Sequence, residues 1–401
     1  MAPCARVLFS LGGPRYSQIR MGRLLLHTND IAGAGSSQEG LVLLEDDRVL
    51  AVGAEALGAS VDRTLRLEGS LLPGLIDLQV NGAGGRGVEE CTADALDTVA
   101  RTVWSGGAVA FLPTLISAPF EDLLAQTTAL ADWIEAWDGV GARPLGIHLE
   151  GPFLEVPGAH PAECLLDPEP ARVQSLIDAA RGHLKLLTLA PARPGAVQAT
   201  AQLHAAGVCV SIGHASDDTR LSECVGAGAQ MVTHLFNAMS ALHHREPGIA
   251  GHCLADASLV CSLIVDGVHV HPTMVQNAFR CLGAERMVLV TDCMAAAGMP
   301  DGTYSLGSSQ VTLADGEVRD ANGALAGSSI LMTDAVHRFL EFVPGTDGTD
   351  VARLASTNPA RLMGLEDMGL IAPGTAPGFS LLTVDGHVQA IALEETSAPS
   401  R

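Results

Sequence analysis

The chain contains 401 residues, of which 47% are apolar and 17% are charged. It can therefore bury one large core together with a smaller module, and its composition argues against wholesale disorder. Its formal charge of −22 argues against binding to nucleic acid or to an anionic membrane surface. Nine scattered cysteines without a C-x-x-C pair fit a reducing cytoplasm better than a disulfide framework, and no apolar run approaches the roughly 20 residues of a membrane span.

The two ends of the chain resemble parts of one small β-domain. Residues 22–72 alternate short apolar and polar runs with turns, as an antiparallel β-unit does, and similar runs return in residues 379–391. We therefore expect a β-sandwich built from both chain ends. The first 20 residues hold three arginines and no acid, as a transit peptide can, although a loose tail or a true start at Met21 is the favoured interpretation.

The region between these ends is typical of an α/β protein, a (β/α)₈ TIM barrel. Eight short apolar runs look like buried parallel strands, at residues 74–82, 108–115, 144–154, 184–191, 208–216, 231–239, 261–270 and 287–295. Helical segments lie between them, at residues 93–105, 120–136, 171–181 and 196–206. A β-excursion is expected at 303–326, followed by helices near 329–343 and 350–363. The predicted domains are a sandwich of residues 1–72 and 368–401 and a metal-dependent barrel of residues 73–367.

Polar patches follow the apolar runs at the ends of five predicted strands, in segments 148–152, 211–214, 232–234, 266–269 and 290–292. Reactive residues at the carboxyl ends of successive strands are typical of the active face of such a barrel. Glu150, His214 and His234 form a carboxylate-plus-two-imidazole set that can hold Zn²⁺ or Fe²⁺ with a position open for water. Asp292 is placed to accept a proton from that water and to deliver it to a leaving nitrogen.

Taken singly, these residues have structural explanations. A histidine beside a glycine is usually a surface or capped residue, and an aspartate after a strand often caps a helix. Their joint occurrence at consecutive strand ends favours metal-assisted hydrolysis. Cys293, next to Asp292, could suggest a nucleophile, but no strand-end histidine is clearly left over to pair with it.

A basic loop at residues 243–248 follows the sixth predicted strand. In a strongly acidic chain, Arg245 and its neighbouring histidines are a candidate anchor for a phosphate or carboxylate. A solvated loop explains the same residues equally well, so composition leaves both interpretations open. Lysine occurs once, at Lys185, which excludes a P-loop and leaves one residue that could be a carboxylated metal ligand.

Eight motifs occur in order along the chain: Pro-Gly-Leu-Ile-Asp at 73–77, Phe-Leu-Pro-Thr at 111–114, His-Leu-Glu-Gly-Pro-Phe at 148–153, Gly-His-Ala at 213–215, Thr-His-Leu-Phe-Asn-Ala-Met at 233–239, Arg-Glu-Pro-Gly at 245–248, Asp-Gly-Val-His at 266–269 and Leu-Ala-Gly-Ser-Ser at 325–329. Over residues 40–375 this set resembles the N-acetylglucosamine-6-phosphate deacetylases of the amidohydrolase superfamily. The Phe-Asn-Ala-Met and Arg-Glu-Pro-Gly stretches are far more specific to that family than Pro-Gly-x-Ile-Asp.

The resemblance implies an enzyme that hydrolyses the acetamide of N-acetylglucosamine 6-phosphate to glucosamine 6-phosphate and acetate. It implies that Glu150, His214 and His234 hold one divalent transition metal per chain, with Zn²⁺ favoured over Fe²⁺, Co²⁺ or Mn²⁺. It also implies that Asp292 is the general base and acid, and that His160 polarises the acetamide carbonyl.

The resemblance further implies the substrate contacts and the assembly. The backbone around Asn237 and Ala238 would contact the amino sugar. Arg245 and His269 match residues that reach the sugar phosphate across a dimer interface, which implies a homodimer. The implied protein is a cytoplasmic enzyme of amino-sugar metabolism.

The chain departs from the wider superfamily in its first barrel strand, where Gln79 and Asn81 replace a His-x-His pair. Two ligands of a second metal are therefore absent, as in the single-metal branch of the family. His148 lies two residues before Glu150, on the same strand face but deeper in the barrel, and is a weaker candidate for a substitute ligand. Lys185 is weaker still.

Three rivals stay open at this point. N-acetylgalactosamine 6-phosphate differs from the implied substrate in the configuration of one hydroxyl, which sequence does not distinguish. The anion anchor at Arg245 disfavours a different amidohydrolase such as a cyclic-amide hydrolase. The intact set of metal-ligand and acid–base residues disfavours a catalytically inactive barrel that serves as a scaffold.

Overall fold

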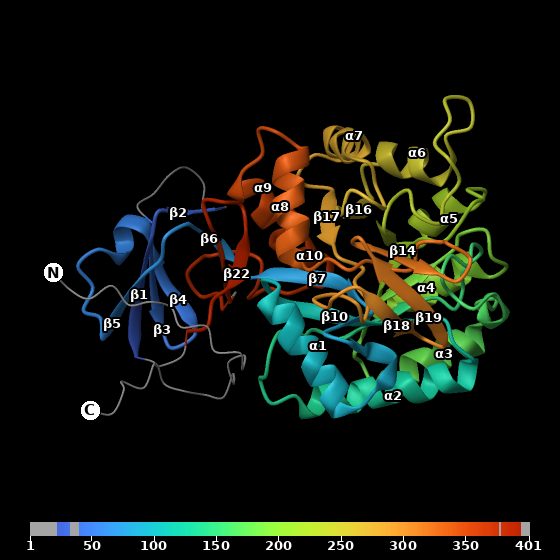
Figure 1. Ribbon diagram of the computed structural model, residues 1–401, viewed down its shortest axis with the longest axis horizontal. Helices are drawn as coiled ribbons and strands as arrows, with labels where there is room; N and C mark the ends of the chain where they lie inside the picture. The colour runs from blue at the N-terminus through green and yellow to red at the C-terminus, as the bar shows by residue number, and fades with distance from the viewer. Residues whose placement is uncertain (1–21, 33–39, 377, 394–401) are drawn as a thin grey trace.

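The computed structural model describes residues 22–32, 40–376 and 378–393. The arginines of the first 20 residues and the alternative start at Met21 lie outside this part of the chain. A small β-domain lies at one end of the molecule and a large α/β barrel at the other (Figure 1). None of the helices in the described ranges is long and apolar enough to cross a membrane.

The small domain consists of two four-stranded sheets. One sheet has the order β4-β3-β1-β5, with β1 (Arg23–Thr28), β3 (Gly40–Glu45), β4 (Arg48–Val52) and β5 (Arg63–Arg66). The other has the order β2-β6-β21-β22, with β2 (Asp30–Ile31), β6 (Ser70–Pro73), β21 (Phe379–Leu382) and β22 (Val388–Ala390). Leu24 and Leu44 of the first sheet and Leu71 and Phe379 of the second belong to one buried cluster. The prediction of a sandwich built from both chain ends is thereby confirmed.

Eight parallel strands form the barrel, in the predicted order along the chain. They are β7 (Leu75–Val80), β10 (Ala108–Ile116), β12 (Ile147–Glu150), β13 (Leu184–Leu189), β14 (Cys209–Ile212), β15 (Ala229–Val232), β16 (Val260–Ile264) and β17 (Met287–Val290). Each pairs in parallel with the next. The last and first strands meet where Val80 bridges to Cys293 and the Asp292 amide donates to the Gln79 carbonyl at 3.0 Å. The predicted fold class is confirmed.

Helices cover the outside of the barrel (Figure 1). They are α1 (Ala93–Ser105), α2 (Phe120–Ala136), α3 (Pro170–Ala179), α4 (Ala196–Ala205), α5 (Leu221–Gly226), α6 (Gly248–Ala255), α7 (Pro272–Leu282), α8 (Met332–Phe342), α9 (Gly348–Ala352) and α10 (Asn358–Leu362). In α8 the buried side chains follow helical spacing, at Met332, Ala335, Val336 and Phe339. Between α9 and α10 a π-helical turn, Arg353–Thr357, interrupts the single helix predicted at 350–363. Pro359 has no amide hydrogen to donate, so the regular hydrogen-bond pattern cannot continue through this point.

A three-stranded antiparallel sheet follows the eighth barrel strand, as predicted for residues 303–326. It has the order β18 (Gly302–Leu306), β19 (Ser309–Ala314) and β20 (Glu317–Asp320). Its inner face packs on the segment after β17 through Leu306, Val311, Leu313 and Val318. Shorter pairs are formed by β8 (Gly82–Ala83) with β9 (Arg86–Gly87) and by β11 (Arg143–Pro144) with β10. The added sheet therefore lies beside the end of the barrel where the polar patches emerge.

Candidate active site

The strand ends deliver the predicted metal and acid–base residues to one place. Glu150 is the last residue of β12, and His214, His234 and Asp292 each follow the last residue of their strand by two positions. All four are nearly enclosed, with exposed fractions of 3%, 5%, 4% and 8% in that order. Parallel strands in a barrel end at the same face, so residues more than 140 positions apart in sequence become neighbours.

The backbone at three of these residues is left-handed. The φ angles are +49° at His214, +30° at His234 and +51° at Asp292. Residues other than glycine seldom adopt this conformation, which costs about 1 kcal/mol or more per residue. The surrounding hydrogen bonds hold the chain in this unfavourable geometry, and each turn directs its side chain into the barrel mouth.

Three ligand atoms form a tight triangle. Oε1 of Glu150 lies 2.9 Å from Nε2 of His234 and 3.2 Å from Nε2 of His214, and the two Nε2 atoms are 3.1 Å apart. A tetrahedral ion with bonds of about 2.0–2.1 Å holds its ligand atoms roughly 3.3 Å apart. The spacing of the three atoms therefore suits one small cation.

The protonation of His214 points to the same conclusion. Its Nδ1 lies 2.8 Å from the Val156 carbonyl oxygen, which can only accept a hydrogen bond, so the ring proton of neutral His214 is on Nδ1. Its Nε2 then presents a lone pair to the carboxylate and to the His234 ring. A backbone carbonyl on the far nitrogen is the usual arrangement around a metal-binding histidine. Three potential ligand atoms converge in a buried place at the spacing that one ion requires, so Glu150, His214 and His234 fit a divalent metal.

The charge of Glu150 dominates the electrostatics of this triangle. Burial alone would raise the pKa of Glu150, but hydrogen bonds with His160 and His234 hold it well below its usual range. Burial lowers the pKa of His234, yet the hydrogen bond and charge of Glu150 outweigh that effect and raise it overall. Glu150 is therefore a carboxylate anion, as a metal ligand must be.

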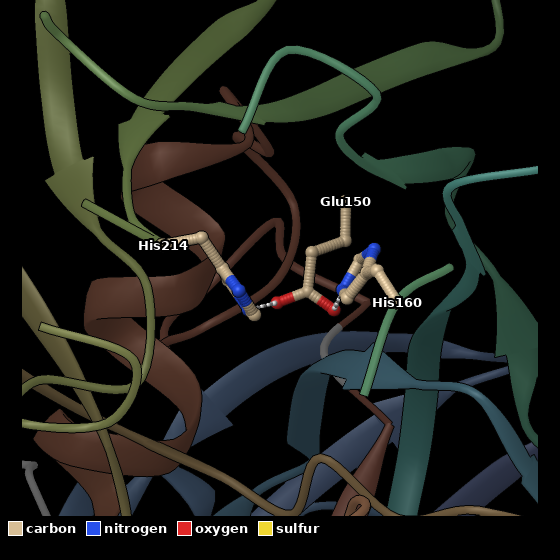
Figure 2. Close-up of side chains that lie close together, drawn as sticks. All are labelled: Glu150, His160 and His214. Atoms are coloured by element: carbon tan, nitrogen blue, oxygen red, sulfur yellow. Dashed lines mark ion pairs between the residues drawn. The ribbon is translucent and has the colours of Figure 1, made fainter. Parts of the chain in front are cut away.

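His160 lies on the other side of the same carboxylate. Figure 2 shows Glu150 between His214 and His160, with one carboxylate oxygen directed at each ring. The Nε2 of His160 is 3.4 Å from Oε2, and the potential ligand atoms of these three residues lie within 4.8 Å of one another. His160 is thus both a neighbour of the predicted ligand set and a further potential ligand.

The hydrogen bonds of His160 define which nitrogen carries its proton. The Ser117 amide donates to Nδ1 at 3.1 Å, so Nδ1 bears the lone pair and Nε2 bears the hydrogen. Burial lowers the pKa of His160, which keeps the ring neutral. The side chain therefore carries an N–H donor, directed at Oε2 of Glu150 at the edge of the pocket, and such a donor can polarise a carbonyl oxygen.

Asp292 faces the triangle from the last strand. Nε2 of Gln79 and Nδ2 of Asn81 both donate to its Oδ1, at 2.9 and 2.8 Å. The Gln79 nitrogen also donates to Oε1 of Glu150 at 3.0 Å, so one amide bridges the two carboxylates. Burial, reinforced by the charge of Glu150, raises the pKa of Asp292 to about 6. A carboxyl with this pKa can both take up and release a proton near neutral pH.

A cavity of about 170 Å³ opens above these residues. Asn237, Ala238 and His269 line it together with the ligand set, and Ile116, Leu306 and Leu325 form an apolar side. The Nδ1 of His269 lies 2.6 Å from Oδ2 of Asp266, which orients the ring toward the cavity. The structure thus brings eight of the nine predicted site residues to one pocket.

The ninth, Arg245, does not reach this pocket. It is exposed in the loop between β15 and α6, and its backbone amide contacts only the neighbouring ring of His243, at 3.4 Å. This loop projects from the body of the molecule (Figure 1, yellow). Arg245 is therefore not among the residues that line the pocket beside Glu150 in the same chain.

The two weaker ligand candidates lie elsewhere. Lys185 is the second residue of β13, near the end of the barrel opposite the site. His148 is fully buried between Thr114 and Thr188, with its two ring nitrogens 3.3 and 2.9 Å from their hydroxyl oxygens. Burial lowers the pKa of His148 to about 4, so the ring is neutral and fully hydrogen-bonded without a metal.

Sequence reasoning missed the roles of three polar residues. Gln79 and Asn81 were expected only as lost metal ligands, whereas they are the donors that hold Asp292. Their positions two apart on one strand face, at the site end of β7, were the available signal. Ser117, which sets the tautomer of His160, left no signal in the sequence.

Known proteins match this geometry. The family model described as "Amidohydrolase family" matches residues 70–394. The chain belongs to the amidohydrolase family. The prediction of a metal-dependent amidohydrolase is thereby confirmed.

This amidohydrolase is similar over most of its length to deacetylases of phosphorylated amino sugars. It is 37% identical over 325 residues to the N-acetylgalactosamine-6-phosphate deacetylase of Escherichia coli O157:H7, covering 80% of this chain and 85% of that protein. It is 32% identical over 359 residues to the N-acetylglucosamine-6-phosphate deacetylase of Bacillus subtilis (strain 168), covering 88% and 90%. The resemblance seen in the motifs is thus confirmed.

Solved structures show the same likeness. A variant of N-acetyl-D-glucosamine-6-phosphate deacetylase from Mycobacterium smegmatis, in complex with N-acetyl-D-glucosamine-6-phosphate, superposes with a TM-score of 0.86 at 34% identity. The match covers 92% of this chain and 97% of that one. The enzyme from Thermotoga maritima gives a TM-score of 0.80 at 29% identity.

Proposed function

We propose that this amidohydrolase hydrolyses the acetamide of N-acetylglucosamine 6-phosphate to glucosamine 6-phosphate and acetate. The observation that carries the proposal is the convergence of potential ligand atoms from Glu150, His214 and His234 beside a carboxyl of raised pKa, Asp292. The names of the relatives and the sugar phosphate bound in the Mycobacterium smegmatis structure support the substrate class.

Glu150, His214 and His234 would hold one divalent transition metal, with Zn²⁺ favoured over Fe²⁺, Co²⁺ or Mn²⁺ by the mixed imidazole and carboxylate donors. When bound, such an ion supplies Lewis acidity, which polarises a carbonyl oxygen and acidifies water. Gln79 and Asn81 are poor substitutes for the imidazoles of a second site, since an amide oxygen binds these ions weakly. Their amide nitrogens are moreover engaged with the two carboxylates.

The side chains of this chain supply the proton transfers. The Nε2 hydrogen of His160 donates to the acetamide carbonyl oxygen and stabilises the negative charge that develops there. Asp292 removes a proton from the attacking water, whose oxygen bonds to the carbonyl carbon. The same carboxyl then gives that proton to the amide nitrogen as the carbon–nitrogen bond breaks, which releases acetate and the free amine.

The sugar and its phosphate are bound around the rim. The backbone at Asn237 and Ala238 contacts the sugar. His269, which was expected to reach the phosphate across a dimer interface, lines the pocket of its own chain and, oriented by Asp266, contacts the phosphate there. Arg245 contacts the phosphate bound by a second copy of the chain in a homodimer. Its exposure on a projecting loop supports this role, because such a loop is available to a neighbouring subunit.

The galactosamine epimer is the second candidate substrate, since one of the similar relatives is named for it. We place the enzyme in the cytoplasm, and the eight free cysteines in the described part of the chain support this location. The deciding experiment measures acetate release from both epimeric sugar phosphates and from the unphosphorylated sugars. We expect a higher kcat/KM for the gluco epimer. A higher kcat/KM for the galacto epimer would make N-acetylgalactosamine 6-phosphate the substrate. Absence of acetate release from all of these sugars would refute the proposed function.

A further inference from the structure

Two residues from the sequence motifs have no part in the proposed chemistry. They are Asp77, in Pro-Gly-Leu-Ile-Asp at 73–77, and Ser328, in Leu-Ala-Gly-Ser-Ser at 325–329. Both are buried, with exposed fractions of 2%. Asp77 lies in β7 and Ser328 follows β20, so they are remote from each other in sequence. In the structure both contact one residue, Thr291, which immediately precedes Asp292.

Asp77 holds Thr291 from one side. Its Oδ2 accepts a hydrogen bond from the Thr291 hydroxyl at 2.6 Å, and its Oδ1 accepts from the Thr291 amide at 3.2 Å and from the Gln79 amide at 3.3 Å. The carboxylate thereby joins the last strand of the barrel to the first. It also fixes the backbone of Gln79, whose side chain donates to Asp292.

Ser328 holds the same peptide from the other side. Its hydroxyl donates to the Thr291 carbonyl at 2.6 Å, and its amide donates to the Asp292 carbonyl at 2.9 Å. The Asp292 amide donates to the Gln79 carbonyl at 3.0 Å. Every backbone polar group of residues 291 and 292 is therefore tied to Asp77, Gln79 or Ser328.

These hydrogen bonds stabilise a residue whose backbone is left-handed. The Asp292 φ of +51° is unfavourable, and a relaxed backbone would turn the carboxylate away from the pocket. A buried carboxyl such as Asp77 is itself costly, and burial raises its pKa to about 7.

We propose that Asp77, Thr291 and Ser328 form a clamp of positioning residues that holds the Asp292 carboxylate in its working orientation. The inference rests on the proposed function, in which Asp292 transfers the proton. The clamp does not touch the substrate, and it acts through the backbone of residues 291 and 292 and through that of Gln79.

The test compares Thr291→Val with Thr291→Ser in the full chain loaded with Zn²⁺. Valine keeps the shape of threonine but loses the hydroxyl held by Asp77, whereas serine keeps the hydroxyl. We expect Thr291→Val to lower kcat about 10- to 100-fold, because a small displacement of a reacting group has effects of this size. KM and metal content should stay within about twofold of the wild type, and Thr291→Ser should recover most of the turnover.

Ser328→Ala tests the clamp from the opposite side and should also lower kcat at unchanged KM, even if Thr291→Val fails to fold. A wild-type kcat in both variants, or a loss of bound metal that accounts for the fall, would overturn the inference. Asp292→Asn distinguishes a failure of the clamp from a failure of the proposed function. If Asp292→Asn is itself fully active, the proposed function fails; if it is inactive while Thr291→Val and Ser328→Ala are fully active, only the clamp fails.

A double variant adds a readout that a purely structural role would not change. In the Asp292→Asn background, Thr291→Val should cause little further loss of kcat, because the group that the clamp orients is already gone. An equal fold-loss in both backgrounds would show that Thr291 acts independently of Asp292, and would overturn the proposal.

Discussion

The barrel interior holds two polar layers that differ in one respect. The mouth layer consists of Glu150, His214, His234 and Asp292. The inner layer lies one step deeper and consists of Thr114, His148, Thr188, Ser211 and Thr233. Both layers are buried, and both contain histidine. His148 precedes Glu150 by two residues, or about 6.6 Å of strand.

The polar side chains of the inner layer are all paired by hydrogen bonds within the protein. Thr114 donates its hydroxyl hydrogen to the Leu112 carbonyl at 3.1 Å, so the Nδ1 of neutral His148 donates to Thr114. Nε2 of His148 then accepts from Thr188 at 2.9 Å, Thr188 from Thr233 at 2.7 Å, and Thr233 from Ser211 at 2.6 Å. Each hydroxyl donates once, and the chain of hydrogen bonds is complete without an ion.

The polar atoms of and around the mouth layer are not all paired in this way. Oε1 of Glu150 and the Nε2 atoms of His214 and His234 crowd around one point, and Nδ1 of His234 and Oδ1 of Asn81 have no hydrogen-bond partner among the described residues. The comparison teaches that burial of polar residues does not mark a site by itself. Converging polar atoms that are not all paired are what demand a ligand, and three of the four predictions below test this difference.

Removal of metal should have the largest effect. Chelation is expected to abolish acetate release and Zn²⁺ to restore it, with about one ion bound per chain by elemental analysis, because only the mouth layer offers unpaired ligands. Two tightly bound ions per chain would contradict the comparison and would point to His148 or Lys185 as an unrecognised ligand.

Asp292→Asn should have the second-largest effect on acetate release. The amide keeps the shape of the side chain but cannot accept the proton, so kcat should fall about 10²- to 10⁴-fold with metal content unchanged. Asp94→Asn, at an exposed carboxylate of α1, is the matched control and should leave kcat unchanged. A turnover above a tenth of the wild type would remove Asp292 from the mechanism.

Arg245→Ala probes a residue outside both layers. Loss of a charge-assisted phosphate contact should raise KM for the phosphorylated sugar about 10- to 100-fold. Hydrolysis of the unphosphorylated sugar should hardly change, and the exposed Arg220→Ala should change neither. Equal losses on both substrates would instead indicate that Arg245 has a structural role.

His148→Phe should have the smallest effect on catalysis and a clear effect on stability. Phenylalanine fills similar space but removes the ring's hydrogen bonds to Thr114 and Thr188, so the Thr188 hydroxyl loses its acceptor. This loss should lower the free energy of unfolding by about 1–3 kcal/mol in denaturant titrations. Bound metal per chain should be unchanged. Loss of the metal would place His148 in the mouth layer after all.

Much of this architecture could be predicted from local sequence. The α1 and α2 helices occupy the predicted residues 93–105 and 120–136, and all eight barrel strands were found in order. Strand positions were predicted too long at their carboxyl ends, since β14 stops at Ile212 and β15 at Val232. The reason is that the left-handed turns at His214 and His234, which end the pairing, have no propensity signal of their own.

The sequence by itself determined the elements and the reactive residues at their ends, because periodicity and strand-end position are local properties. Tertiary structure decided which donors complete each reactive group: Gln79 and Asn81 on Asp292, Val156 on His214 and Ser117 on His160. It also separated His148 from the metal-binding set that its sequence position allowed. Hydrogen-bond partnership depends on the distance and direction between atoms far apart in the chain, and closure of the barrel is what brings them within reach.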